Sequence, residues 1–220
     1  MKKTILTSVF AMFAASAASA AVTPYAAIRG GYDYHTVNTG SITVDGTDIG
    51  AELGNPAGSG YAFGAAAGVS ADLSDFFGVR GEVEYTYANA NLEEDTLNDD
   101  DLPQKDKFES DSHTVLLNVY GDIKTATPFT PYVGAGIGYS WSNIALKEEG
   151  GKLEFDDSAF AWQVGAGVSY ALDNALTLDL GYRFMNVMGL EYEGTDEGEA
   201  IKVKADTYSH QVYLGARYAF

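Results

Sequence analysis

The sequence predicts an all-β protein, an eight-stranded antiparallel up-and-down transmembrane β-barrel, and three observations lead to this prediction. Apolar and polar residues alternate with a period of two over eight segments, which is typical of strands with two unlike faces. The last segment, 208–220, alternates up to a final phenylalanine. Short and long connections alternate between the segments. Strands of about ten residues with one lipid face and one lumen face are what an outer-membrane barrel requires.

Each of the eight predicted strands has one apolar face, and across these faces aliphatic residues lie mainly in the middle and aromatic residues lie mainly near the ends. This arrangement is typical of bilayer-facing strands, because Tyr and Trp accumulate at membrane–water interfaces. In one of these strands Val133, Ile137 and Trp141 share a face, and three glycines lie on the other. The predicted strands span residues 24–34, 61–71, 77–88, 113–123, 132–142, 160–170, 176–185 and 208–220.

The connections predict which end of the barrel faces the periplasm. Residues 72–76, 124–131 and 171–175 are expected to form short turns, and the four longer stretches are expected to form loops. Outer-membrane barrels have short periplasmic turns and longer extracellular loops. Both termini are therefore expected in the periplasm and the long loops outside the cell. The expected loops are residues 35–60, 89–112, 143–158 and 186–207.

The first twenty residues have the layout of a secretory signal peptide. Lys2 and Lys3 precede an apolar stretch, and small residues follow up to Ala20. The apolar stretch is too short to span a membrane as a helix. We therefore expect residues 1–20 to be a signal peptide and residues 21–220 to form the outer-membrane β-barrel domain. The sequence has no cysteine, so the exported fold is expected to form without disulfides.

Acidic residues outnumber basic residues by 31 to 13, for a net charge of −18, and removal of Lys2 and Lys3 makes it −20. This charge argues against nucleic acid as a partner. Acidic residues cluster in the expected loops 89–112 and 186–207. They indicate a solvated surface, divalent cations that bridge to phosphorylated surface lipid, or capture of a basic host or substrate molecule. The run 98–101 lacks the glycine and terminal glutamate of an EF-hand, and no metal or cofactor is expected.

Charged residues of both signs fall on the inward side of the predicted strands, and they include every arginine of the chain. An isolated buried charge is costly, and an eight-stranded barrel is just wide enough for side chains to fill it. We therefore expect a lumen network of salt bridges and hydrogen bonds. The alternative is the selectivity lining of a narrow pore, which the many small inward residues would allow. The predicted network consists of Arg29, Arg80, Glu82, Glu84, Asp122, Asp179, Arg183 and Arg217.

The histidines do not predict an enzyme. A hydrolase of this size would need a nucleophile and a base on one face, within hydrogen-bonding distance. His113 and His210 fall on the outward face, whereas the neighbouring Ser112 and Ser209 point the opposite way. His35 lies where the first strand is expected to end, and pairing of the first and last strands would bring it toward His210. The spacing of the histidines matches no metal-ligand pattern, so the chain is expected to be non-enzymatic.

Several short motifs, taken in order, resemble the outer-membrane β-barrel porin family, which includes opacity-type surface antigens and small OmpA/OmpX-type barrels. The resemblance extends over the whole chain. It implies a barrel of the Gram-negative outer membrane that serves as a surface antigen, adhesin, envelope-stabilising protein or narrow pore. The motifs are Pro24-Tyr25, Gly-Glu-Val-Glu-Tyr at 81–85, Leu-Asn-Val-Tyr-Gly-Asp at 117–122, the glycine-rich strand at 131–139, Leu-Gly-Tyr-Arg-Phe at 180–184 and terminal Phe220.

The resemblance also implies a role for the last strand. In this family a terminal aromatic residue preceded by alternating apolar residues is the signal that the barrel-assembly machinery reads. The residues that match this signal are Val212, Leu214, Ala216, Tyr218 and Phe220.

The function that we expect is that of a surface-exposed envelope protein that presents binding or antigenic loops. Its expected partners are outer-membrane lipid and lipopolysaccharide, the barrel-assembly machinery, and an extracellular ligand or host molecule. One alternative is a small porin for ions or small solutes. Another is a soluble lipocalin-like barrel, which would instead place its apolar face inward around a ligand.

Overall fold

The computed structural model describes residues 22–44, 47–48, 57–97, 103–148, 151–196 and 199–220, which form a single sheet. Eight long strands close a barrel, and the two-residue strand β2 pairs only with the end of β1. Within the described ranges, no helix is long and apolar enough to cross a membrane. The strands are β1 (Val22–Val44), β2 (Thr47–Asp48), β3 (Ala57–Asp72), β4 (Phe77–Leu97), β5 (Pro103–Ile123), β6 (Phe129–Glu148), β7 (Gly151–Ala171), β8 (Leu176–Asp196) and β9 (Glu199–Ala219).

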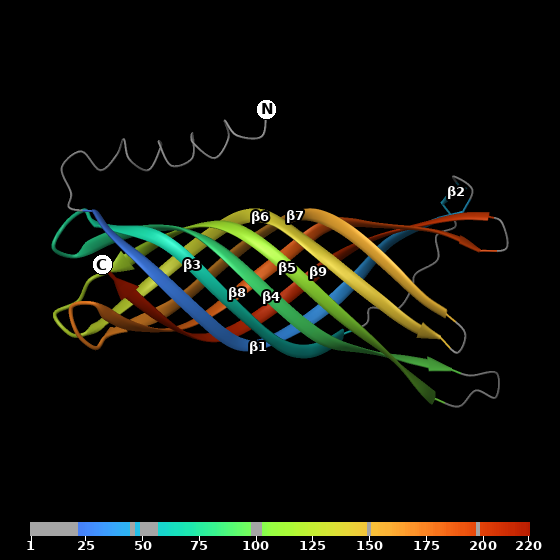
Figure 1. The fold of residues 1–220 in the computed structure, drawn as a ribbon, viewed down its shortest axis with the longest axis horizontal. Helices are drawn as coiled ribbons and strands as arrows, with labels where there is room; N and C mark the ends of the chain where they lie inside the picture. Colours follow the sequence, from blue (N-terminus) through green and yellow to red (C-terminus); the bar gives the residue numbers. More distant parts are fainter. Residues whose placement is uncertain (1–21, 45–46, 49–56, 98–102, 149–150, 197–198) are drawn as a thin grey trace.

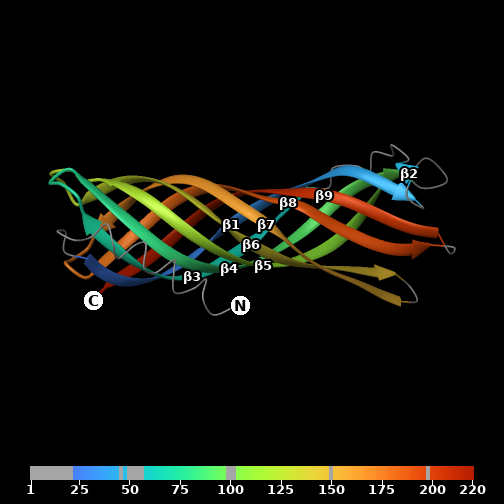
Figure 2. The same cartoon turned by 90° about the horizontal axis from the view of Figure 1, so that it is seen from above.

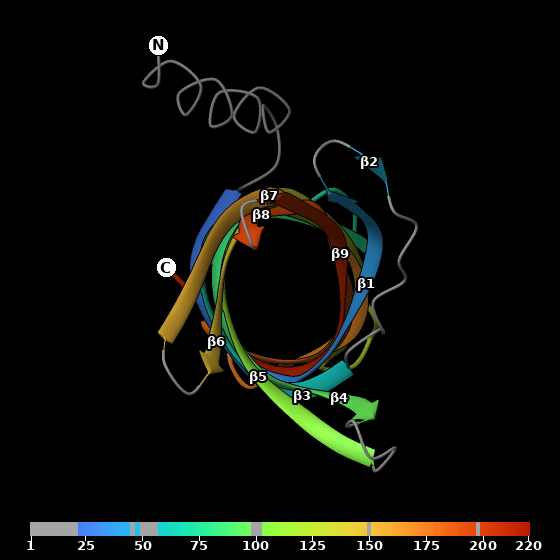
Figure 3. The ribbon, with the colours of Figure 1, turned by 90° about the vertical axis from the view of Figure 1, so that its right-hand side faces the viewer.

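The barrel closes through antiparallel pairing of its first and last long strands. Each of the eight strands pairs with its neighbour in the chain, and β9 returns to pair with β1. The β1–β9 register runs from Tyr25 opposite Ala219 to Val44 opposite Ile201. Figure 3 shows the resulting ring of strands seen along the barrel. Closure lets the backbone groups of β1 and β9 hydrogen-bond to each other, because a bilayer offers them no other partner. The predicted fold class, an eight-stranded antiparallel barrel, is confirmed.

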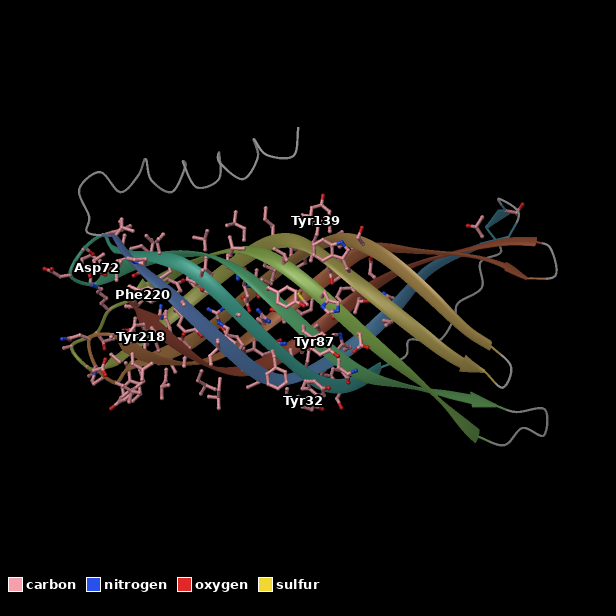
Figure 4. All side chains as sticks on the ribbon, viewed as in Figure 1. Tyr32, Asp72, Tyr87, Tyr139, Tyr218 and Phe220 are labelled. Atoms are coloured by element: carbon pink, nitrogen blue, oxygen red, sulfur yellow. The ribbon has the colours of Figure 1, made fainter. Side chains whose placement is uncertain are left out.

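Side chains alternate between the lumen and the outside along each strand. On β3, for example, Ala62 is 2% exposed whereas the next residue, Phe63, is 57% exposed. The exposed aromatic residues form two groups (Figure 4): Tyr218 and Phe220 lie near the end with the short turns, and Tyr32 and Tyr139 lie farther along the barrel. The apolar face is thus on the outside, which rules out the lipocalin-like alternative.

The strands continue well beyond the segments predicted from the sequence. β4 and β5 remain paired up to Leu97 opposite Pro103, so much of the expected loop 89–112 is a hairpin. The other three expected loops, 35–60, 143–158 and 186–207, are likewise largely taken up by extended strands, so the prediction of long loops was wrong. Beyond the lipid both faces of a strand meet water. The apolar alternation therefore stops although the backbone ladder continues. Figures 1 and 2 show these hairpins projecting from one end of the barrel.

Short turns join the strands at the opposite end, beside the C-terminus (Figure 1). In the β7–β8 turn the Asp173 carboxylate accepts hydrogen bonds from the amides of Ala175 (2.7 Å) and Leu176 (2.8 Å). These bonds lower the pKa of Asp173, because they favour the ionised carboxylate. In the β5–β6 turn the Thr125 hydroxyl donates to the carbonyl oxygen of Phe129 at 2.6 Å. Local bonds from Asp and Thr side chains thus shape these tight connections.

Candidate functional site in the barrel lumen

The middle of the lumen is crossed by an ion-paired cluster of two arginines and two glutamates. Arg29 Nη1 lies 2.7 Å from Glu82 Oε1 and 3.1 Å from Glu84 Oε2. Arg183 Nη1 lies 2.9 Å from Glu84 Oε1. Because β4 and β8 are four places apart in the ring of eight, the bridge from Arg183 to Glu84 joins opposite walls of the barrel. All four side chains are at most 5% exposed.

Neutral side chains supply further hydrogen bonds to the two glutamates. Asn118 Nδ2 donates to Glu84 Oε2 at 2.8 Å and approaches Glu82 Oε1 at 3.3 Å. Gln163 Nε2 donates to the Asn118 side-chain oxygen at 2.6 Å, and the Tyr120 hydroxyl donates to Glu82 Oε1 at 3.0 Å. Buried carboxylates are tolerated when their lone pairs are satisfied in this way. The network therefore reaches strands β5 and β7 as well.

A second ion pair lies nearer the short turns. The Arg80 guanidinium donates from Nε and Nη2 to the Asp122 carboxylate at 2.8 to 3.0 Å. The same guanidinium lies 4.6 Å from the centre of the Tyr120 ring and 4.9 Å from that of Tyr132. An arginine between two aromatic rings gains cation–π attraction in addition to its ion pair. Arg80 is accordingly only 2% exposed.

A third cluster contains the remaining predicted pair. Arg217 Nη2 lies 3.4 Å from Asp179 Oδ1, and Ser169 Oγ donates to the same oxygen at 2.6 Å. The Arg217 guanidinium also lies 5.4 Å from the centre of the Tyr25 ring. The Tyr25 hydroxyl donates to Glu82 Oε2 at 2.8 Å. The lumen thus holds all eight predicted charged residues in three clusters, and tyrosines connect these clusters.

Glycines on the lumen face make room for these tyrosines. The hydroxyls of Tyr132 and Tyr213, from β6 and β9, meet at 3.0 Å. Both lie against Gly181, where a Cβ atom would overlap the Tyr213 ring and come within 2.6 Å of the Tyr132 hydroxyl. A Cβ at Gly167 would overlap the Tyr132 hydroxyl as well. The small inward residues therefore accommodate large aromatic side chains.

The sequence analysis missed a fourth polar cluster, nearer the hairpin end, around Asp33. Asp33 is fully buried and accepts hydrogen bonds from Ser209 Oγ and, at 3.2 Å, from Gln211 Nε2. His35 Nε2 lies 3.1 Å from Asp33 Oδ2. Asp33 lies within the predicted strand 24–34 and has the same parity as Arg29, so the alternation alone could have identified it as an inward residue.

The expectation that His35 lies toward His210 needs correction. His35 pairs across the β1–β9 ladder with Ser209, and the partner of His210 is Tyr34. His35 is buried inside the barrel, whereas His210 is exposed outside. His35 and Ser209 both contact Asp33, with no hydrogen bond between them in the described part of the chain. This order does not activate a serine, because the histidine would have to contact the hydroxyl directly.

The acidic residues of the hairpins fall partly beyond what the structure describes. The run 98–101 lies outside the described residues, as do the side chains of Glu191 and Glu193. Among the described residues, no group of three His, Asp or Glu side chains is placed to hold a metal ion. Asp111 is described, and it accepts hydrogen bonds from the Tyr87 hydroxyl (2.7 Å) and Asn89 Nδ2 (2.9 Å).

The terminal strand β9 presents its alternating apolar residues outward. Val212, Leu214 and Tyr218 are 53%, 67% and 52% exposed, and Ala216 is partly exposed on the same face. Phe220 is 75% exposed, and its amide donates to the carbonyl oxygen of Pro24 at 3.0 Å. The last residue therefore takes part in barrel closure, and its ring lies on the lipid side.

This geometry defines a transmembrane barrel with a lipid-facing exterior and a charged interior, and comparison with known proteins identifies its class. The chain belongs to the outer membrane protein beta-barrel domain family, which matches residues 5–220. An uncharacterized protein of Brucella abortus is 36% identical over 109 residues, which cover 45% of this chain and 38% of that relative. The outer membrane protein PagN of Salmonella typhimurium is 30% identical over 117 residues, 49% of each chain. The matches span less than half the length of these relatives.

A solved structure shows the same architecture. Neisserial surface protein A superposes with a TM-score of 0.51 at 19% sequence identity, over 88% of this chain and 99% of that chain. At this identity the likeness concerns the fold. Together with the family match, it confirms that the chain is an outer-membrane protein of the Gram-negative type.

Proposed function

We propose that the protein is a surface-exposed outer-membrane barrel with a closed lumen, and that its four outer hairpins carry its function. The observation that carries this proposal is the Arg183–Glu84 bridge across the middle of the barrel. Its side chains are 5% and 0% exposed, and Arg29 and Asn118 fill the space beside it. Solutes would have to break these interactions to pass, which favours an envelope and surface role over the porin alternative.

The hairpins are suited to bind positively charged partners outside the cell. The chain carries 31 acidic and 13 basic residues, and the stretch 89–112 alone holds nine acidic residues. The membrane-spanning part pairs its carboxylates internally, so the uncompensated charge lies mainly in the hairpins. We infer that these hairpins present antigenic surface and bind a basic host or substrate molecule, or divalent cations that bridge to lipopolysaccharide.

The proposal includes a route to the membrane. Residues 1–20 act as the signal peptide, and residues 21–220 form the barrel domain. The outward residues of β9, with Phe220 at the end, are recognised by the barrel-assembly machinery. The mature protein acts without a cofactor and without catalysis, as the Ser209–Asp33–His35 arrangement supports.

Conductance of the refolded mature protein in a planar bilayer tests the closed lumen. We expect no reproducible current steps from the wild type, whose folding is verified by heat-modifiable mobility on a gel. Steps that appear in the wild type and change in size with Arg183→Ala would contradict the proposal and support the small porin. Lys124→Ala is the matched control, because Lys124 pairs with Asp72 outside the lumen.

A further inference from the structure

Two histidines face the lipid at the outer limit of the apolar band. His113 on β5 lies ten residues from the exposed Ile123, and His210 on β9 lies ten residues from Phe220. Ten residues of strand span about 33 Å, and a tilt of about 40° reduces this to about 25 Å along the membrane normal. This height equals that of the apolar band of such barrels. Both imidazoles therefore lie where the hydrocarbon ends and the headgroups of the outer leaflet begin.

The two histidines make the same kind of tyrosine contact on opposite sides of the barrel. The Tyr85 hydroxyl lies 2.7 Å from His113 Nδ1, and the Tyr182 hydroxyl lies 2.7 Å from His210 Nδ1. In both pairs the tyrosine precedes the histidine by 28 residues. An aromatic ring of the neighbouring strand packs against each imidazole. Because β5 and β9 are four places apart in the ring, the barrel carries this arrangement twice, on opposite walls.

The direction of the tyrosine hydrogen bond decides whether the other ring nitrogen, Nε2, is a donor or an acceptor. When the phenol donates to Nδ1, the neutral imidazole carries its proton on Nε2, and a protonated imidazole donates from both nitrogens. In both of these states Nε2 is a donor, whereas a neutral imidazole that donated from Nδ1 to the phenol oxygen would present Nε2 as an acceptor. We assign the donor role to the phenol, because a phenol O–H is a stronger acid than a neutral imidazole N–H. No described residue hydrogen-bonds to Nε2 of His113 or His210. An unsatisfied donor on a lipid-facing surface is costly, so its acceptor is expected to come from the lipid.

We propose that the Tyr85–His113 and Tyr182–His210 pairs are two binding sites for the phosphate groups of lipopolysaccharide in the outer leaflet. A phosphate oxygen is a strong acceptor, and its bond to an imidazolium is charge-assisted. It also lies at the boundary of hydrocarbon and headgroup, where the two Nε2 atoms are placed. This inference concerns the lipid-facing wall and does not depend on the function proposed for the hairpins.

The charged and titratable neighbours distinguish the two sites. His113 lies beside Tyr85, Tyr87 and Asp111, and the Asp111 carboxylate repels a phosphate although two side chains hydrogen-bond to it. The neighbours of His210 on β8, β9 and β1 are the aromatic residues Tyr182, Phe184, Tyr208 and Tyr34. Asp206 lies four residues before His210, and its carboxylate accepts a hydrogen bond from the Gly189 amide at 2.8 Å. We therefore expect the His210 site to bind phosphate more tightly.

Titration of the refolded protein in micelles with bisphosphorylated lipid A, followed by native mass spectrometry, tests the sites. His210→Phe keeps the ring but removes the donor, and it should weaken lipid A binding about five- to tenfold. His113→Phe should have a smaller effect, and the double variant the largest. His210→Gln retains an N–H donor on a side chain of similar length, and its affinity for lipid A should stay within about twofold of that of the wild type. Tyr218→Phe removes an exposed hydroxyl at the periplasmic end and should change nothing.

Three results would overturn the proposal. The first is equal binding by the wild type and the double variant, each verified as folded by heat-modifiable mobility. The second is equally tight binding of lipid A from which the phosphates have been removed. The third is competition by inorganic phosphate at the concentration of the lipid, which would indicate a free-anion site. If a phenylalanine variant fails to fold, Tyr182→Phe replaces it. That variant should weaken binding about twofold, and no change would count against the site.

Discussion

At the residue scale, the lumen depends on ion pairing of its buried charges. Each of the two central glutamates contacts an arginine and at least one neutral donor, so neither carboxylate is left as an isolated buried charge. The inward parity of these residues could be predicted from the alternation. Which arginine pairs with which glutamate could not be predicted, because Arg183 and Glu84 are 99 residues apart and meet only through curvature of the sheet.

Arg183→Met is expected to destabilise the barrel by about 3 kcal/mol, because Glu82 and Glu84 would then share Arg29 alone and one buried negative charge would be uncompensated. Glu84→Gln in the same chain should recover part of this loss, since the uncompensated charge is then gone. Urea unfolding of the refolded protein measures the difference.

The matched control for this prediction is Lys124→Met. Lys124 and Asp72 form an exposed ion pair, with side chains 32% and 69% exposed, so its loss should cost less than about 1 kcal/mol. Equal unfolding midpoints for Arg183→Met and Lys124→Met would show that the lumen pair contributes no more than a surface pair.

Gly181→Ala is expected to destabilise the protein by about 1–3 kcal/mol, because the new methyl group would overlap the Tyr213 ring and force it to move. Gly78→Ala is the control: its nearest neighbour would be the Asp72 carboxylate at 3.4 Å, an ordinary contact. The difference in unfolding midpoint tests the prediction. A Gly181→Ala midpoint as high as that of Gly78→Ala would mean that the tyrosines tolerate displacement.

At the element scale, the alternation predicted the strands only where lipid lies on one side. In β4 it identified residues 77–88, and the strand continues to Leu97. Residues 93–96 are all polar, so the sequence shows no period of two there. The pairing itself persists, because backbone hydrogen bonds do not depend on side-chain polarity.

Phe220→Ala is expected to lower the amount of assembled barrel in the outer membrane, because Phe220 completes the outward apolar row of the closing strand. Its ring also packs edge-on against Tyr218 at 5.5 Å. Heat-modifiable mobility of the membrane fraction measures assembly. Phe76→Ala is the matched control, since Phe76 is 71% exposed in a turn at the same end. Similar losses in the two variants would contradict a special role for the terminal residue.

At the scale of the whole molecule, the two ends of the barrel differ in a way that orients it. The end with the C-terminus carries short turns, and the other carries long paired hairpins (Figure 1). The family match makes the first end periplasmic and the second extracellular. The acidic hairpins then meet the outside medium, and the histidines proposed as phosphate sites meet the outer leaflet.

Proteinase K added to intact cells is expected to cleave the hairpins while the barrel remains assembled. The β4–β5 ladder from Phe77–Ile123 to Ala88–Ser112 stays within the membrane and keeps cleaved chains together. Fragments should therefore migrate as one folded species until they are heated. Cleavage that requires a permeabilised outer membrane would instead place the hairpins in the periplasm.

The sequence by itself determined the class of fold, the number of membrane-spanning strands, the lipid and lumen faces, and the charged residues that point inward. These properties follow from the alternation of apolar and polar residues with a period of two, which can be recognised within each strand by itself. Only the tertiary structure decided which charges meet, that Asp33 holds His35 and Ser209, that the expected loops are hairpins, and that each outward histidine contacts a tyrosine 28 residues before it. These properties depend on the register between strands and on barrel closure, which bring distant parts of the chain together.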